Sequence, residues 1–517
     1  MLNVVVFSCG AALMGLEMVA ARVLAPFLGN SIYVWGSVIS VVMIALSLGY
    51  WIGGQIADRF GAARALPPVI AGAGLATAFA PLIAKAVLPT ISELGPRLGS
   101  LAAAALIYFV PAILLAMVSP LGVRLAANRG ITHLGRSAGS LYAVSTAGSI
   151  AGTIATSFWL IPLLSVEPLI VWTGFVLAAT ALLALGLPGG EQESIANPLA
   201  TQVAGGAAVL LVAASLAIGG YVLWRVAPAP SVNETGEAVL FRADTEYHRI
   251  TVTEDDTTRH LRFDASHQTA IDLDDPYVSR IRYPDYMHLA LALNPNAKRV
   301  LVLGLGGGAT TKRYWRDYPE VSVDSVEIDK VVVDVARRYF SITEDERSRV
   351  FVDDARRYVQ RTDETYDIII VDAYYSDSLP FHLTTQEFLG ELKACMNPDG
   401  VVAYNVISSA EGSGNELFRS MYRTAGTVWD RLWVFPIGLG EEGTPGARRN
   451  IIVLATDALV AEEEFRSRIA DRVDGRVTIQ GFPEMAADLY AGPVRAADVP
   501  LLTDAHAPVD SLIRVND

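Results

Sequence analysis

The first 226 residues are dominated by long, uninterrupted runs of apolar side chains. Each run is close to the ~20 residues that a helix needs to cross the core of a bilayer, or longer. Gly, Pro and charged residues stand between the runs, and the runs are continuously apolar rather than amphipathic, which favours membrane spans. We expect about seven spans, at 3–28, 33–56, 67–90, 99–120, 139–163, 166–187 and 203–225. Gly148 and Gly152 are best explained by close helix packing.

The pattern changes after residue 226. Pro and polar residues predict a linker at 227–237. Residues 238–292 form a small segment whose first part alternates apolar and polar positions with β-forming side chains, which predicts an antiparallel sheet. From 293 to 517, short buried strands alternate with helical stretches, which is typical of a doubly wound α/β sheet. We therefore predict an all-α polytopic membrane bundle at 1–226, followed by the β segment and an α/β domain.

Composition supports this division. Hydrophobic residues make up 52% of the 517 residues, too many for an ordinary soluble enzyme. Up to Pro230 the chain has nine Lys or Arg and six Asp or Glu, against 31 and 48 in the remainder, so the net charges are +3 and −17.

Without a basic stripe interleaved with aromatic residues, no nucleic-acid partner is expected. Cys9 lies in an expected span and Cys395 in an expected helix, so we expect neither a disulfide nor a metal site.

The short loops indicate the orientation in the membrane. Arg59, Arg64 and the arginines between 124 and 136 lie on one side, which predicts a cytoplasmic N-terminus. Seven spans would then place residues 227–517 outside the cell. One span more or fewer would place them in the cytoplasm, so the side of the membrane on which they lie stays open. We expect a multi-pass protein of the plasma membrane, in contact with the lipid bilayer. Charged residues such as Glu17 within the spans leave transport open, although a structural role is the simpler interpretation.

A glycine-rich turn is the first candidate ligand-binding motif in the second part of the chain. The buried strand 299–303 runs into Gly304-Leu305-Gly306-Gly307-Gly308, and a helix follows near Thr310. The next strand ends at Glu327, roughly twenty residues after the glycines, where a carboxylate can accept hydrogen bonds from both ribose hydroxyls. Because no Gly-Lys-Ser/Thr follows the turn, we do not expect a loop that binds a nucleoside triphosphate.

Two further acids follow the next two strands. Asp353-Asp354-Ala355 ends one, where a carboxylate could accept from the exocyclic amine of adenine, and strand 366–371 leads to Asp372. Ligands in open α/β sheets bind outside the carboxyl ends of the strands, so these groups predict one crevice that binds a nucleoside. Taken singly, each acid could instead be a helix N-cap or a solvated loop charge.

From about Tyr247 to Ile407 the sequence resembles the polyamine aminopropyltransferases, the spermidine synthase family. The whole chain resembles bacterial fusions of a multi-pass membrane domain with a spermidine-synthase-like domain. The motifs that carry the resemblance are Phe263-Asp264-Ala265-Ser266-His267-Gln268, the loop Gly304 to Gly308, Val326-Glu327-Ile328-Asp329, Asp353-Asp354-Ala355, Ile369-Ile370-Val371-Asp372, Leu383-Thr384-Thr385-Gln386-Glu387-Phe388 and Asn397-Pro398-Asp399-Gly400. Thr503 to Val509 resembles a tail common in these fusions.

The resemblance implies a Rossmann-like fold of the methyltransferase type and transfer of an aminopropyl group, as from putrescine to spermidine. Decarboxylated S-adenosylmethionine would be the co-substrate, methylthioadenosine the product, and a small amine or polyamine the acceptor, with no tightly bound cofactor. Asp372 would be the general base, since a carboxylate can take the proton of an attacking amine. The resemblance also implies a homodimer. The nucleoside contacts would be His248, Gln268, Gly304, Gly306, Glu327, Asp354 and Ala355, and the acceptor contacts Tyr283, Tyr375 and Asp377.

Four positions depart from the family pattern. Gly307 stands where the family usually has an Asp, and His248 stands where it has a Gln. Tyr375 stands in place of the family's second acid, and Asp377, two residues further on, could substitute for that acid. Arg282-Tyr283-Pro284 stands in place of a Tyr-His pair. Two alternatives therefore stay open. The protein could be a sensor or transporter that binds a nucleoside or polyamine without turnover, or another S-adenosyl-dependent transferase such as a methyltransferase. Tyr374, Tyr375, Phe381 and His382 could form a lid over the nucleoside or serve packing alone.

Overall fold

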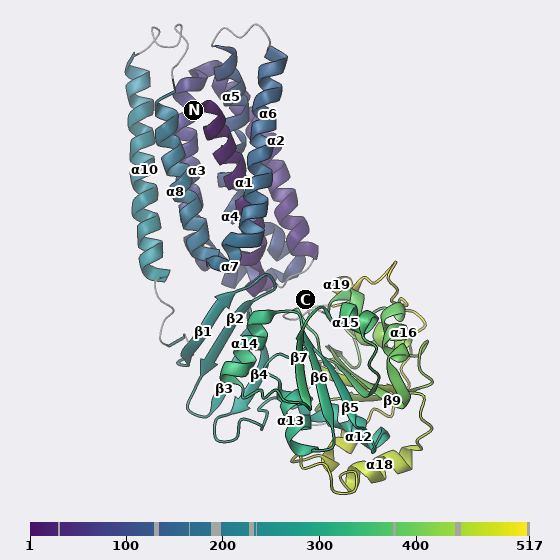
Figure 1. Ribbon diagram of the computed structural model, residues 1–517. Helices are drawn as coiled ribbons and strands as arrows, with labels where there is room; N and C mark the ends of the chain where they lie inside the picture. The colour runs from purple at the N-terminus through teal and green to yellow at the C-terminus, as the bar shows by residue number, and fades with distance from the viewer. Residues whose placement is uncertain are drawn as a thin grey trace. The chain divides into compact units, whose positions relative to one another are not determined.

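The computed structural model describes residues 1–28, 32–128, 134–164, 166–187, 198–226, 232–233, 235–375, 379–439 and 446–513 (Figure 1). The chain divides into two compact units, Met1–Ala229 and Pro230–Asp517. Each unit has its own core of buried apolar side chains.

The first unit is an elongated bundle of helices (Figure 1). In the described residues, six helical stretches are long and apolar enough to cross a membrane: Leu2–Leu28, Ile32–Phe60, Ala62–Leu94, Arg97–Ala127, Val166–Leu185 and Gln202–Leu223. Its elements are α1 (Leu2–Leu28), α2 (Ile32–Phe60), α3 (Ala62–Ile91), η1 (Ser92–Leu94), α4 (Gly95–Ala116), α5 (Val118–Ala127), α6 (Leu134–Ala155), the π-helical η2 (Thr156–Leu160), α7 (Ile161–Leu163), α8 (Val166–Leu185) and α10 (Pro198–Val226).

The expected span at 139–163 folds as α6, η2 and α7, but it is not among these six stretches, so the count of seven spans stays a prediction. Small residues let α6 pack closely against α1. A Cβ atom at Gly148 would lie 2.2 Å from the carbonyl oxygen of Phe7, and one at Gly152 would lie 2.2 Å from that of Ala11. Glycine is therefore needed at both positions, in agreement with the predicted close packing.

The second unit contains a small antiparallel sheet, as the alternating sequence predicted. Its strands are β1 (Ala238–Asp244), β2 (Arg249–Glu254), β3 (Thr258–Phe263) and β4 (Ser266–Asp272), paired in that order. Apolar side chains of this sheet, including Ile250 and Leu261, form a core with Val332, Val335 and Phe340 from and beside α14 (Lys330–Tyr339). One face of the sheet is thus covered, which accounts for the alternation.

A seven-stranded sheet follows, with the order β10-β11-β9-β8-β5-β6-β7. Strands β9, β8, β5, β6 and β7 are parallel, and β11 and β10 complete the sheet in antiparallel pairs. The chain leaves β5 toward β6 and β7 on one side and later returns to β8 and β9 on the other. The carboxyl ends of β5 and β8 therefore flank the switch point, the usual place for a ligand in a doubly wound sheet. The strands are β5 (Arg299–Leu303), β6 (Ser322–Glu327), β7 (Ser348–Val352), β8 (Tyr366–Val371), β9 (Met396–Ser409), β10 (Arg431–Pro436) and β11 (Arg448–Thr456).

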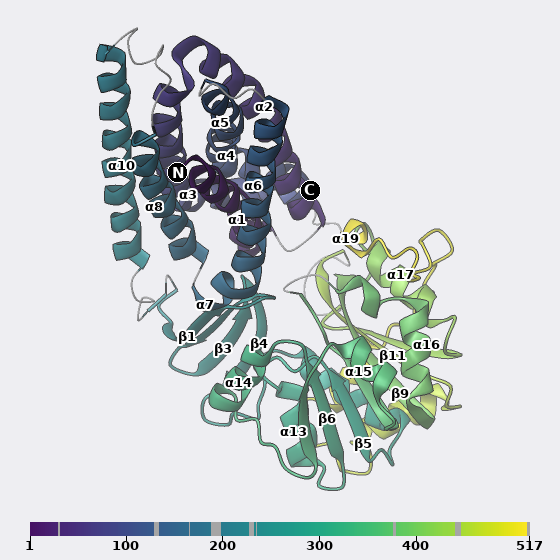
Figure 2. The same cartoon turned by 45° about the horizontal axis from the view of Figure 1, so that its top comes forward.

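Alternate residues of the central strands enter two different cores. Val300, Val302 and Ile370 pack with Tyr314 and other residues on one face. Leu301, Leu303 and Ile369 pack on the other face with Phe388 and Phe418. Burial on both faces explains why these strands are continuously apolar in the sequence. Helices α15 (Ala355–Arg361) and α16 (Gln386–Ala394) lie side by side on the second unit (Figures 1 and 2).

The remaining elements of this unit are α11 (Tyr283–Tyr286), η3 (Met287–Leu289), α12 (Ala290–Leu293), α13 (Ala309–Asp317), α15 (Ala355–Arg361), η4 (Phe381–Leu383), α16 (Gln386–Ala394), α17 (Glu416–Ala425), α18 (Glu462–Ala470), η5 (Pro483–Asp488) and α19 (Val509–Leu512). The architecture confirms the predicted fold class, with a helical first part, a small antiparallel sheet and a doubly wound α/β sheet.

Candidate active site

One pocket opens at the carboxyl ends of β5, β6, β7 and β8. Ten of the eleven predicted site residues line it: His248, Gln268, Tyr283, Gly304, Gly306, Glu327, Asp354, Ala355, Asp372 and Tyr375. The eleventh, Asp377, lies outside the described residues. The structure thus brings together groups that are up to 127 residues apart in the chain. Their individual roles stay predictions.

Gly304 allows the loop after β5 to approach the end of β8. Its φ is 97°, a conformation that L side chains rarely adopt, and a Cβ atom there would lie 2.3 Å from the carbonyl oxygen of Asp372. The Asp372 amide donates to the carbonyl oxygen of Leu303 over 2.8 Å. These contacts fix the position of Asp372 at the edge of the glycine loop.

Glu327 lies at the end of β6 and is only 7% exposed. Its Oε2 accepts from the backbone amides of Leu305 and Gly306 over 3.0 and 3.3 Å, and its Oε1 accepts from the amide of Asp329 over 3.1 Å. Burial raises the pKa of this carboxyl, and the three amides oppose that shift. Oε2 already accepts two hydrogen bonds, but Oε1 accepts only one and keeps a lone pair, so the carboxylate can still accept from a sugar hydroxyl.

Asp354 follows β7 and is the N-cap of α15, where its Oδ1 accepts from the amide of Arg357 over 2.9 Å. Its Oδ2 lies 3.3 Å from Nε2 of His382. The hydrogen bond with His382 lowers the pKa of Asp354, so the group is a carboxylate at neutral pH. The N-cap and ligand interpretations are therefore compatible, because they use different oxygens.

Asp372 is bonded to Asn405 on the neighbouring strand β9. Nδ2 of Asn405 donates to Oδ1 of Asp372 over 2.9 Å, and Nδ2 of Asn450 donates to Oδ1 of Asn405 over 3.0 Å. Burial raises the pKa of Asp372 to about 7, although hydrogen bonds from Asn405 and Tyr283 oppose the shift. A carboxyl with a pKa near neutrality suits a general base.

Aromatic rings line the wall of the pocket next to these acids. The His248 ring stacks on Phe263, with centroids 4.5 Å apart, and lies 5.9 Å from the ring of Tyr375. Tyr374 is fixed from behind, because its hydroxyl donates to the carbonyl oxygen of Asn405 over 2.9 Å and accepts from the amide of Ile407 over 2.8 Å. Of the four residues considered for a lid, Tyr374, Tyr375 and His382 line the pocket, whereas Phe381 is 56% exposed and does not.

Thr269 of β4 packs against Gly307 in the glycine loop. The Gly307 amide donates to Oγ1 of Thr269 over 2.9 Å, and a Cβ atom at Gly307 would lie 2.7 Å from Cγ2 of Thr269. The space that a side chain at Gly307 would need is therefore filled by Thr269. The glycine at residue 307, where the family usually has an Asp, therefore fits the close packing of Thr269 against this loop.

Sequence analysis missed Asn405 and Thr269. Asn405 is 1% exposed in a strand whose neighbours Ala403, Tyr404 and Val406 are also buried. A polar side chain in such a run requires a buried partner, and this was the signal that could have identified it. Thr269 gave no comparable signal, since Thr is common in strands.

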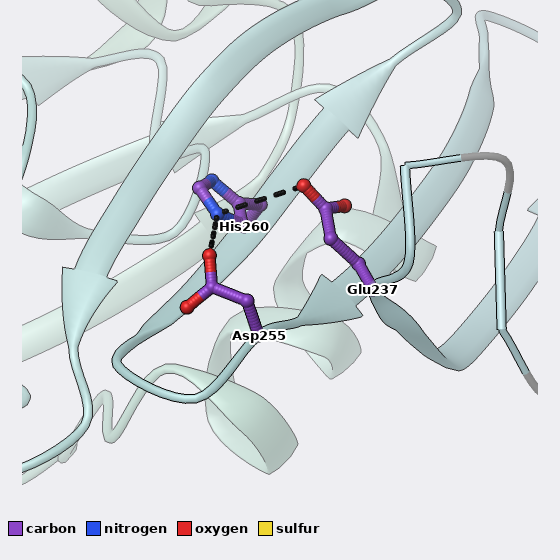
Figure 3. A group of neighbouring side chains, drawn as sticks. All are labelled: Glu237, Asp255 and His260. Carbon is purple, nitrogen blue, oxygen red and sulfur yellow. Dashed lines mark hydrogen bonds and ion pairs between the residues drawn. The ribbon is translucent and has the colours of Figure 1, made fainter.

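A second group of polar side chains lies in the small sheet. Glu237, Asp255 and His260 place ligand atoms within 4.8 Å of one another (Figure 3). Nε2 of His260 lies 3.3 Å from Oδ2 of Asp255 and 3.9 Å from Oε1 of Glu237. Both oxygens of Glu237 also accept from the guanidinium of Arg262, over 2.8 and 2.9 Å, which lowers the pKa of Glu237 to about 2. The group is explained as an ion-pair network, and the expectation of no metal site stays a prediction.

Comparisons with known proteins identify the domain. Residues 282–411 match the family model of the spermine/spermidine synthase domain. The chain is 36% identical over 195 residues to a polyamine aminopropyltransferase of Vibrio vulnificus, covering 36% of this chain and 65% of that protein. It is 35% identical over 136 residues to a probable polyamine aminopropyl transferase of Bifidobacterium longum, covering 26% of this chain and 30% of that protein.

Among solved structures, a probable spermidine synthase from Corynebacterium glutamicum aligns with 50% of this chain and 99% of its own, at 18% identity and a TM-score of 0.41. The family match spans the glycine loop, Glu327, Asp354 and Asp372. Residues 282–411 are therefore similar to the spermine/spermidine synthase domain.

Proposed function

We propose that this protein is an aminopropyltransferase that uses decarboxylated S-adenosylmethionine as donor and an amine or polyamine as acceptor. The observation that carries the proposal is the position of Asp372, whose pKa is raised to about 7, in one pocket with Glu327 and Asp354. The match of residues 282–411 to the spermine/spermidine synthase domain and the similarity to polyamine aminopropyltransferases support it.

In the proposed reaction the acceptor nitrogen attacks the donor carbon next to the sulfonium. The new C–N bond forms as the C–S bond breaks, and the bonding electrons return to sulfur, which leaves neutral methylthioadenosine. Asp372 takes the proton that the amine nitrogen loses, because only a deprotonated amine has a free electron pair. Tyr283, which contributes a hydrogen bond to Asp372, would help to orient the acceptor.

The other half of the pocket would hold the nucleoside. Glu327 would accept from the ribose hydroxyls and Asp354 from the exocyclic amine of adenine. Gly304, Gly306 and Ala355 would let the backbone approach the nucleoside, with His248 and Gln268 along the wall. Tyr375 and Asp377 would contact the acceptor.

We further propose that the helical unit anchors the enzyme in the plasma membrane as a multi-pass protein, in contact with the lipid bilayer. The six long apolar helices support membrane insertion. A homodimer is proposed from the family resemblance.

A second candidate is favoured by the packing at Gly307. With Thr269 filling this space, the pocket wall at Gly307 carries a methyl group and a hydroxyl instead of a carboxylate. The ammonium of an aminopropyl donor would then lack an anionic partner at this point. This favours another S-adenosyl-dependent transferase, or a sensor or transporter that binds the nucleoside without turnover.

Detergent-purified protein incubated with decarboxylated S-adenosylmethionine and a panel of amines and polyamines tests the first candidate, with methylthioadenosine followed by mass spectrometry. We expect the wild type to release methylthioadenosine together with one aminopropylated amine, and Asp372→Asn to release neither. Glu462→Gln, at an exposed ion pair with Arg466, is the control and should retain the activity. If the wild type binds methylthioadenosine but shows no turnover, the protein has a binding role. If it transfers a methyl group from S-adenosylmethionine, it is a methyltransferase.

A further inference from the structure

The motif Thr503 to Val509 near the C-terminus has no part in the proposed reaction. Its carboxylate, Asp504, is nevertheless bonded to the elements that border the pocket. Oδ1 and Oδ2 of Asp504 accept from Nη1 and Nη2 of Arg356 over 2.7 and 2.8 Å. Oδ1 also accepts from the hydroxyl of Thr385 over 2.7 Å. Asp504 therefore joins α15 to the segment that leads into α16.

Arg356 lies two residues after Asp354 and is held by two carboxylates at once. Nε and Nη2 donate to the two oxygens of Glu391, each over 2.8 Å, in addition to the two bonds to Asp504. Nη1 also donates to the carbonyl oxygen of His382 over 3.2 Å. The side chain is 13% exposed. Paired fork-like bonds of this kind fix direction as well as distance, which a single lysine contact would not do.

These bonds tie down the segment 380–385 at two points. Arg356 holds the carbonyl group of His382, and Asp504 holds the side chain of Thr385, which is also the N-cap of α16. The hydroxyl of Tyr404 holds the carbonyl oxygen of Leu383 between them, over 2.9 Å. Pro380, His382 and Leu383 line the pocket. The segment is therefore a wall of the pocket whose position depends on the C-terminal motif.

His382 transmits this position to Asp354, since its Nε2 lies 3.3 Å from Oδ2 of that carboxylate. The amide of Arg357 holds the other oxygen, so the plane of the carboxylate is set from both sides. A carboxylate that accepts from the amine of a base must have a fixed orientation to discriminate an amine from a carbonyl group.

We propose that Asp504 and Arg356 are positioning residues of the nucleoside site: they hold the segment 380–385 so that His382 orients Asp354 toward the base. The inference rests on the proposed function, because it takes Asp354 as the group that accepts from the exocyclic amine. It assigns to the C-terminal motif a role in recognition of the donor, and no part in the proton transfer at Asp372.

The substitution Asp504→Asn tests the proposal with little change in shape. It removes the charge and turns one oxygen into an amide that faces the guanidinium of Arg356, while the two bonds between Arg356 and Glu391 remain to hold α15. The full-length protein in detergent is used throughout. The probes are methylthioadenosine and its 6-oxo analogue methylthioinosine, and their Kd values are measured by calorimetry on wild type, Asp504→Asn and the control Glu462→Gln.

We expect Asp504→Asn to raise the Kd of methylthioadenosine about tenfold and to reduce the preference over methylthioinosine. Glu462→Gln should change neither. In turnover, KM of the donor should rise while kcat at saturating donor stays the same. His382→Leu, at a side chain 27% exposed, should show the same losses, and the double variant should be no worse than either single variant, because both act through one contact.

Additive effects in the double variant, or unchanged Kd values and an unchanged preference in a folded Asp504→Asn protein, would overturn the inference. His382→Leu, which removes the donor to Asp354, decides the question should Asp504→Asn lower the melting temperature too far for binding to be measured: unchanged preference in that variant overturns the inference. A wild type that binds no methylthioadenosine overturns the proposed function and this inference together, whereas a wild type that binds it and a variant that binds it equally well overturn the inference alone.

Discussion

The amide of Asn405 donates to Oδ1 of Asp372 over 2.9 Å, across the pair of neighbouring strands β8 and β9. Asn450 on β11 holds the amide of Asn405 in turn, over 3.0 Å. The carboxylate proposed as the general base is therefore oriented by a chain of two amides that crosses three adjacent strands. Because Asn405 donates, it stabilises the charged form of Asp372 and limits the rise in pKa caused by burial.

Asn405→Leu should move the acid limb of the pH–rate profile upward by about one pH unit, because the ionised form of Asp372 loses a hydrogen-bond donor. The expected result is about a tenfold loss of kcat/KM at pH 6 and a much smaller loss at pH 9. Profiles of kcat/KM from pH 5 to 9.5 measure the shift. Asn450→Ala should shift the limb in the same direction by less, and an equal loss at every pH would show that Asn405 does not act through the ionisation of Asp372.

Asp372→Asn should make the stability of the second unit less dependent on pH. The pKa of Asp372 in the folded protein is about 7, above its ordinary value of 3.8, so its contribution to stability is fully present below pH 3.8 and is lost as the pH rises through about 7. The melting temperature of the variant should therefore exceed that of the wild type above pH 8 and approach it near pH 5. Thermal unfolding followed at both pH values measures this, and a difference that is constant with pH would contradict the burial of an ionisable Asp372.

Gly307→Asp combined with Thr269→Gly should strengthen binding of a donor that carries an ammonium group. A Cβ atom at Gly307 would lie 2.7 Å from Cγ2 and 2.9 Å from Cβ of Thr269, so glycine at residue 269 is needed to make room. We expect KM for decarboxylated S-adenosylmethionine to fall several-fold while Kd for methylthioadenosine, which has no ammonium, stays the same. Gly307→Asp alone is the matched control and should bind both ligands more weakly. If the double variant also binds both ligands more weakly, the ammonium does not lie near Gly307.

Glu327→Gln should raise the Kd of methylthioadenosine about tenfold or more. A glutamine places an amide where the wild type has a carboxylate oxygen that accepts from Leu305 and Gly306, or from Asp329, so it also disturbs the loop. Comparison with 2′-deoxy-methylthioadenosine isolates the ribose contact. The wild type should prefer the ribose form and the variant should lose most of this preference. A preference that survives the substitution would assign the ribose contact to another residue.

Local pattern alone predicted much of the fold. Continuous apolar runs marked the long helices, and buried apolar strands followed by glycine or by an acid marked the edge of the large sheet. Glu327, Asp354 and Asp372 could be identified because each stands at or just beyond the carboxyl end of a strand, and parallel strands end at the same edge. The residue type and its distance from a strand end are properties of a short stretch of chain, so the sequence carries them explicitly.

The contacts that orient those acids were decided only by the tertiary structure. Asn405 reaches Asp372 because β9 lies beside β8, Thr269 fills the space at Gly307 because β4 packs on the glycine loop, and Asp504 reaches Arg356 from a point 148 residues further along the chain. Each contact depends on which element becomes the neighbour of which, and this is set by the packing of whole elements. The sequence by itself thus determined which acids stand at the edge of the sheet, whereas the long-range packing determined which partners set their charge and their direction.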